Sequence, residues 1–145
     1  MSYTISFNNA DASATLRNRV VLKSFIEKRV KKEGLKIDSL NYIFCTDKYL
    51  LKINNDYLSH DYYTDIISFD LSEIPGQLVG EVYISVDRVK DNAKTHGTSL
   101  RDELHRVIFH GALHFCGYKD KKPSDAKKMR HMEDLWLKAY LPNCK

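Results

Sequence analysis

The segment from Ser99 to Gly117 constrains the fold of this chain more than any other part of the sequence. Serine is a residue type that caps helix N-termini, and glycine is the type that most often ends a helix. Between the two the sequence is crowded with apolar side chains, namely Val107, Ile108, Phe109, Leu113 and Phe115. A helix this apolar needs neighbours on most of its surface. We therefore expect a largely buried helix that runs to about Cys116, with the other elements packed around it.

The rest of the chain mixes helical and β patterns without a regular alternation of strand and helix. Strands are predicted at Thr4–Phe7, Ser39–Thr46, Thr64–Leu71 and Leu78–Asp87. Helices are predicted from about Ala14 to Glu33, from Asp47 as the N-cap to Leu58, over Val86–His96, and from Pro123 onward. These elements predict an α+β fold, in which roughly five helices pack on a small mixed sheet of about four strands.

Length and composition are those of an ordinary globular protein. The 145 residues suit one domain, and no linker-like segment divides residues 1–145, so we expect a single domain. The net charge of +4 would help a negatively charged ligand to approach, but it is too small to indicate a partner on its own.

Three observations bear on location. The N-terminal residues lack the basic start and apolar run of a secretory signal. No apolar run approaches the roughly 18 residues of a membrane-spanning helix. The cysteines, Cys45, Cys116 and Cys144, are odd in number and lack CxxC spacing, which argues against a disulfide framework. We expect a cytoplasmic protein that does not associate with membranes.

The buried helix carries two histidines, His110 and His114. Four residues turn a helix by about 400°, so the two imidazoles lie about 40° apart on one face and can bind one metal ion. Without a partner, each buried imidazole would cost about 1–3 kcal/mol. The spacing therefore predicts a metal site on this central helix, and a coincidental pair of histidines is the alternative.

A third ligand is expected just beyond the helix. Gly117 allows the chain to turn back, and Asp120 follows three residues later. Three protein ligands with one position left for water are typical of catalytic rather than structural zinc. His131 is the rival third ligand, although it falls on the predicted last helix.

The spacing of these residues is similar to that of the metzincin metalloproteases. Those enzymes carry a glutamate directly after the first histidine, where it acts as general base. This chain has Gly111 at that position. Loss of such a base typically lowers the rate by about 10²–10⁴-fold, which makes a peptidase the weaker prediction.

Four motifs, taken together, resemble the YbeY family of metal-dependent endoribonucleases. They are Thr64-Asp65-Ile66-Ile67-Ser68-Phe69, Gly80-Glu81-Val82-Tyr83-Ile84-Ser85, the run His110-Gly111-x-Leu113-His114-x-x-Gly117-Tyr118, and Met129 with Glu133. They occur in order over roughly residues 51–137. The resemblance implies a single catalytic α+β domain with a zinc-type site. It also implies cleavage of single-stranded RNA, 3′-end maturation of small-subunit 16S ribosomal RNA, and ribosome quality control.

One departure from the family pattern concerns the metal. The family usually has a third histidine where this chain has Asp120. Aspartate is a competent ligand, so we expect the site to persist with one zinc ion. Its charge makes the ion less electron-poor, which favours harder ions such as manganese, and nickel is a further alternative.

A second departure concerns the phosphate. Where the family usually carries an arginine, six residues before the threonine of the TD element, this chain has Leu58. A cation there would stabilise the charge that builds on the phosphate. His60 is the first candidate for a replacement, and Lys52 and Arg106 are further candidates. If no side chain replaces the arginine, we expect a weak or altered activity.

Thr64, Asp65 and Ser68 fall on a predicted strand, where a carboxylate is unexpected. Asp65 is a candidate to accept the free N–H of a ligand histidine. Alternatively, it caps nearby backbone at the start of the strand. Together with Arg106, these residues are expected either to support the metal ligands through hydrogen bonds or to contact the substrate.

The predicted metal site and the family resemblance together imply a metal-dependent endoribonuclease that acts on single-stranded or ribosomal RNA at the small ribosomal subunit. A metal-bound water is expected either to attack phosphorus or to activate the ribose 2′-OH, and both routes stay open. Two other classes of protein remain as rivals. One is a non-catalytic, metal-containing ribosome assembly factor, and the other is a metzincin-like peptidase.

Overall fold

The computed structural model describes residues 3–59 and 64–141. Within them, four strands form one mixed sheet: β1 (Thr4–Asn9), β2 (Lys36–Cys45), β3 (Ile66–Asp70) and β4 (Gln77–Ser85). The strand order is β1-β2-β4-β3; β1, β2 and β4 are parallel, and β3 is antiparallel to β4. Five helices complete these residues: α1 (Arg19–Lys32), α2 (Asp47–Leu58), α3 (Val86–His96), α4 (Leu100–Phe115) and α5 (Pro123–Tyr140). The predicted α+β fold is confirmed.

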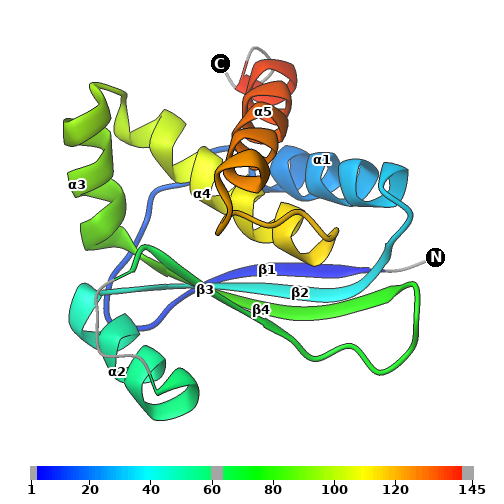
Figure 1. The fold of residues 1–145 in the computed structure, drawn as a ribbon, viewed down its shortest axis with the longest axis horizontal. Coiled ribbons are helices and arrows are strands. Elements are labelled where there is room, and N and C mark those ends of the chain that lie inside the picture. Colours follow the sequence, from blue (N-terminus) through cyan, green and yellow to red (C-terminus); the bar gives the residue numbers. More distant parts are fainter. Residues whose placement is uncertain (1–2, 60–63, 142–145) are drawn as a thin grey trace.

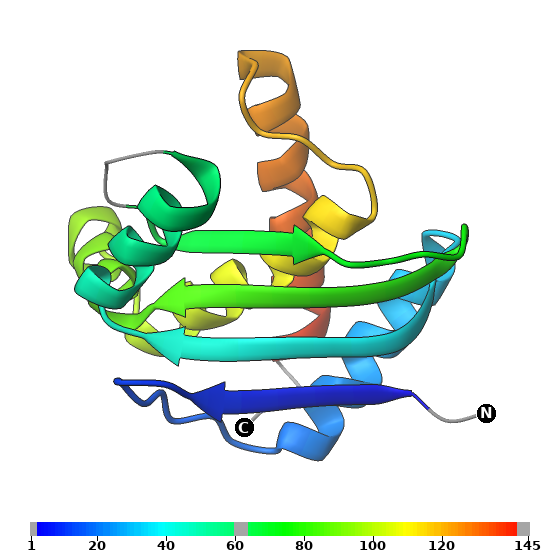
Figure 2. The same cartoon turned by 90° about the horizontal axis from the view of Figure 1, so that it is seen from below.

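The helices are distributed unequally over the sheet. Helices α1, α4 and α5 lie on one face, whereas α2 lies on the opposite side near the ends of the strands (Figure 1). Seen from that opposite side, most of the sheet is not covered by a helix, and β3 forms one edge (Figure 2). The core therefore lies between the sheet and the helices on the covered face.

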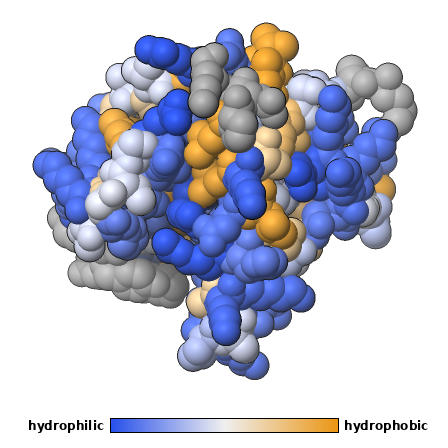
Figure 3. All heavy atoms as spheres, turned by 90° about the horizontal axis from the view of Figure 1, so that it is seen from above, coloured by the Kyte–Doolittle hydropathy of each residue, from blue (hydrophilic) through white to orange (hydrophobic). Residues whose placement is uncertain are grey.

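Helix α4 is the central element that the sequence predicts. Ser99 caps it by accepting a hydrogen bond from the Asp102 N–H at 3.0 Å. Its middle lies against the sheet, where the Tyr42 hydroxyl, itself fully buried, donates to the Ile108 carbonyl at 2.9 Å. Outer helix faces are polar, and hydrophilic residues cover most of the surface on the helical side, apart from a hydrophobic strip (Figure 3).

Gly111 lets α4 approach the sheet closely. A Cβ atom at this position would lie 3.0 Å from Cγ1 of Val82 and 3.1 Å from Cδ1 of Ile66. The position directly after the first histidine thus faces packed strands, not the site. A general base cannot be placed there, which gives a structural reason against the peptidase.

The first predicted helix begins later than expected. It starts at Arg19 rather than about Ala14, because Asn18 takes a left-handed conformation (φ 50°) that interrupts the helical backbone. Val20, in the first turn of the helix, is 81% exposed. The residues of α1 that are buried are Leu22, Ile26 and Val30.

Two further local expectations are wrong. Thr46, not Asp47, caps α2, and its side chain accepts a hydrogen bond from the Tyr49 N–H at 3.2 Å. Strand β3 begins at Ile66, so Thr64 and Asp65 lie before the strand and not within it. In the described part of the chain, no helix combines the length and apolarity needed to cross a membrane.

Candidate metal centre

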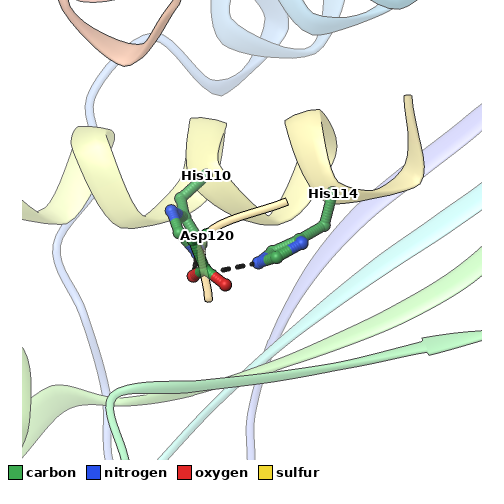
Figure 4. A group of neighbouring side chains, drawn as sticks. All are labelled: His110, His114 and Asp120. Atoms are coloured by element: carbon green, nitrogen blue, oxygen red, sulfur yellow. Dashed lines mark ion pairs between the residues drawn. The ribbon is translucent and has the colours of Figure 1, made fainter. Parts of the chain in front are cut away.

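Three side chains converge between the C-terminal half of α4 and the loop that follows it (Figure 4). Oδ2 of Asp120 lies 3.1 Å from Nε2 of His110 and 3.4 Å from Nε2 of His114. The imidazole rings are 4.5 Å apart between centroids and nearly perpendicular. One potential ligand atom from each residue lies within 4.8 Å of the others. These residues therefore form a His/His/Asp group that could hold one metal ion.

The local sequence explains the convergence. His110 and His114 are one helical turn apart on the same face of α4. Gly117, with φ 98°, takes the left-handed conformation that ends the helix, and its N–H donates to the His114 carbonyl at 3.0 Å. The chain then reverses, which brings Asp120 back beneath the two imidazoles.

A second carboxylate, that of Glu133, contacts the ring nitrogen of His110 that is remote from Asp120. Nδ1 of His110 lies 2.6 Å from Oε2 of Glu133, which is 5% exposed and comes from α5. The other Glu133 oxygen accepts a hydrogen bond from Arg106 at 2.9 Å, and Arg106 also contacts Asp134 at 2.7 Å. With its proton on Nδ1, His110 presents the Nε2 lone pair toward Asp120, as a metal ligand requires.

The electrostatics of the two imidazoles differ. Burial disfavours the imidazolium of His110, but the hydrogen bond and charge of Glu133, with help from Asp120 and Asp65, raise its pKa above the ordinary value. Burial and the neighbouring His110 lower the pKa of His114, although Asp120 and a hydrogen bond with the Tyr118 backbone oppose this shift. The neutral imidazole is the form that binds a metal ion.

The three side chains line a cleft of about 630 Å³ at the β3 edge of the sheet. Its other walls come from α2, from β3 with the residues before it, and from the end and following loop of α4: Asn54, Leu58, Thr64, Asp65, Ile66, Ile67, Ser68, Asp70, Phe115 and Lys121. A cleft with apolar walls and a few convergent polar groups is typical of a ligand site.

Thr64, Asp65 and Ser68 all line this cleft. Asp65 contacts Asn92 at 3.4 Å, while the free N–H of His110 is taken by Glu133 instead. Burial raises the pKa of the Asp65 carboxyl, against the opposing effect of His110. The Ser68 hydroxyl is buried without a hydrogen-bond partner among the described residues.

Several other candidates lie elsewhere. Arg106 pairs with Glu133 and Asp134 and does not line the cleft. His131 borders a different depression, on the surface of α5, and Lys52 is not among the cleft residues. His60 lies outside the described residues, so the structure does not place it.

Sequence reasoning did not assign a role to Glu133. A signal was available, because Glu133 lies at helical spacing from Met129 and Trp136 on the buried face of α5. A carboxylate in such an apolar stripe needs a buried partner. That partner is the imidazole of His110.

The donor set fits a divalent transition metal. Two imidazole nitrogens and one carboxylate oxygen form a three-ligand group of the type that catalytic zinc sites use. The carboxylate behind one imidazole is the usual outer partner of a metal-binding histidine. Fold and site together define an α+β protein with a candidate metal centre of the hydrolase type.

Comparison with known proteins identifies the family. The family model described as "Endoribonuclease YbeY" matches residues 4–141. A protein named Endoribonuclease YbeY from Cytophaga hutchinsonii is 50% identical over 134 residues, which are 92% of this chain and 94% of that protein. One of the same name from Flavobacterium johnsoniae is 44% identical over 126 residues, 87% of this chain and 90% of that protein. The chain belongs to the Endoribonuclease YbeY family.

A solved structure supports the fold. The solution structure of TM1509 from Thermotoga maritima matches with a TM-score of 0.58 at 24% sequence identity, over 92% of this chain and 86% of that chain. Family membership confirms the predicted resemblance and the predicted enzyme class, an endoribonuclease and thus a hydrolase. It does not favour the peptidase or the non-catalytic assembly factor.

Proposed function

We propose that this protein is a metal-dependent endoribonuclease that cuts single-stranded RNA, and that its substrate is the 3′ region of small-subunit 16S ribosomal RNA. One observation carries the proposal: Nε2 of His110, Nε2 of His114 and Oδ2 of Asp120 meet in a cleft at the sheet edge. Relatives at up to 50% identity carry the name endoribonuclease. Maturation of ribosomal RNA, ribosome quality control and a cytoplasmic location belong to the same proposal, with residues 1–145 acting as one catalytic domain.

His110, His114 and Asp120 would hold the ion, which we take to be zinc, with manganese or nickel as alternatives. When bound, such an ion supplies Lewis-acid chemistry for phosphodiester cleavage. Glu133 fixes the tautomer and orientation of His110 from its buried position on α5. Thr64, Asp65 and Ser68 line the same cleft, and we expect them to contact the RNA.

The cleft also bears on which RNA can enter. It lies at the edge of the sheet and its walls include apolar side chains such as Leu58, Ile66 and Phe115. Such walls can contact the faces of unstacked bases, which a double helix keeps inside. The expected substrate is therefore a single strand.

The decisive experiment measures metal content and RNA cleavage side by side for the wild type and His114→Ala. We expect the wild type to contain about one ion per chain and to cut a single-stranded RNA but not its duplex. His114→Ala should lose both the ion and the cleavage. Metal-independent cleavage by the variant, or a wild type that binds metal but never cuts RNA, would refute the proposal.

The products distinguish the two chemical routes. A 2′,3′-cyclic phosphate end shows attack by the neighbouring 2′-OH, whereas a 5′-phosphate end shows attack by water. A substrate with a single 2′-deoxy nucleotide at the cleavage site is the matched control, since it blocks only the first route. The role in ribosome maturation is tested in cells: a His114→Ala/Asp120→Ala protein that restores 16S maturation would favour a binding role instead.

A further inference from the structure

The cleft around the candidate metal ligands contains more carboxylates than lysine and arginine side chains. Among its described residues, Asp65, Asp70 and Asp120 are acidic, and Lys121 is the one lysine or arginine. A phosphodiester brings another negative charge to this place. A metal ion offsets part of this repulsion, but the phosphates beside the reacting one still meet carboxylates. A protein cation close to the ion therefore has a large effect on RNA binding here.

Lys121 lies where such a cation is needed. It follows Asp120 directly, in the short loop between Gly117 and Pro123. Both ends of this loop are fixed, because Gly117 ends α4 and Pro123 begins α5. Lys121 is exposed, and within residues 3–59 and 64–141 no ion pair joins its ammonium group to a carboxylate. The charge is therefore available to a ligand.

On the α2 side of the cleft, none of the described lining residues carries a positive charge. Helix α2 contributes Asn54 and Leu58 to the cleft, and both are uncharged. Arg106, the arginine nearest to the ligands in sequence, is held by Glu133 and Asp134. Among the described residues, the lysine or arginine that lines the cleft is thus Lys121, in the loop between α4 and α5.

We propose that Lys121 is a substrate-binding residue, whose ammonium group contacts a backbone phosphate of the RNA strand beside the metal centre. This inference rests on the proposed function and names the residue through which the cleft receives its polyanionic substrate. The chain provides two matched controls, Lys119 and Lys122. They flank the same position in the same loop, carry the same charge and do not line the cleft.

The first test is a binding measurement without cleavage. Affinity of a short single-stranded RNA is measured in chelator over a range of salt concentrations, for wild type, Lys121→Ala, Lys119→Ala and Lys121→Arg. Each lost phosphate contact reduces the slope of log K against log salt by about 0.7 for a single strand. We expect that reduction, with roughly tenfold weaker binding at low salt, for Lys121→Ala but not for Lys119→Ala or Lys121→Arg.

The second test is cleavage of the same RNA with metal added. Lys121→Ala should raise KM by at least the factor by which it weakens RNA affinity. Its metal content should equal that of the wild type. Equal behaviour of Lys121→Ala and Lys119→Ala in both assays would overturn the assignment. If the wild type binds RNA through Lys121 and never cuts it, the proposed function fails while the phosphate contact stands. Loss of cleavage in Lys121→Ala with an unchanged salt slope would also overturn the contact.

Discussion

Nδ1 of His110 and Oε2 of Glu133 are 2.6 Å apart, although 23 residues separate them in the sequence. The contact joins α4 to α5 and leaves the opposite nitrogen of the imidazole for Asp120. Arg106 contacts the second oxygen of Glu133, so the carboxylate is held from both sides. The docking of α5 therefore determines how His110 is presented.

Glu133→Gln should weaken metal binding by about 10–100-fold, because the amide is a poorer acceptor for the His110 N–H and carries no charge. The measurement is a competition titration with a chromogenic chelator. Asp134→Asn is the control, since Asp134 also pairs with Arg106 but does not contact the imidazole. Equal losses in the two variants would show that Arg106, rather than the His110 contact, causes the effect.

Asp120→His should shift metal preference toward zinc and away from manganese. An imidazole suits zinc and nickel, whereas a carboxylate suits harder ions. The measurement is the ratio of zinc to manganese affinity, obtained with both proteins stripped of metal and titrated in parallel. An unchanged ratio would indicate that Asp120 does not contact the ion.

Gly80→Ala should destabilise the protein by about 1–3 kcal/mol through overpacking. A Cβ atom at Gly80 in β4 would lie 2.7 Å from Cζ of the Phe115 ring, which also lines the cleft. Urea unfolding of Gly80→Ala, Phe115→Leu and the double variant forms a double-mutant cycle. The double variant should be more stable than the sum of the two losses, and strict additivity would contradict the close contact.

Asp47 should contribute acid-sensitive stability. Burial opposes its ionisation, but hydrogen bonds from Arg88 and Ser85 outweigh that effect and hold the pKa of the carboxyl below its ordinary value. A depressed folded-state pKa means that the contribution is fully present above the unfolded-state pKa and is lost as pH falls through the folded one. At pH 7, Asp47→Asn should therefore cost about 1 kcal/mol.

The pH dependence separates this effect from simple loss of packing. Below about pH 4 the wild type should lose this contribution progressively, so its unfolding midpoint should approach that of Asp47→Asn. Asp91→Asn is the control, because Asp91 also contacts Arg88, at 3.4 Å, but is exposed. A difference between wild type and Asp47→Asn that stays constant from pH 7 down to pH 2.5 would contradict the assignment.

Most of the fold could be predicted because its signals are local. The capping residue Ser99 and the glycines at positions 97 and 117 mark helix ends, and β-branched runs mark the strands. The start of α1 could not be predicted, because Leu16 continues the apolar spacing up to Asn18, where the backbone turns left-handed. The spacing alone does not distinguish an apolar residue within a helix from an apolar loop residue that packs against the core.

The candidate site, like the fold, could be predicted from the sequence only in part. Helical geometry alone places His110 and His114 on one face, and the turn at Gly117 suggests Asp120. The contact with Glu133 depends on how α5 docks on α4, which a helical period does not specify. The position of Lys121 in the cleft depends on the path of a loop. The sequence alone therefore does not distinguish Lys121 from the other lysines.

The three residues that meet in the candidate centre are contained in the short stretch from His110 to Asp120. All three donors therefore belong to one local segment, which ends before α5 begins at Pro123. Bringing the donors together needs no distant part of the chain, whereas aligning the imidazole of His110 needs α5, which carries Glu133. Local opening of α5 would therefore leave the three donors near one another but release His110 from the orientation that Glu133 imposes.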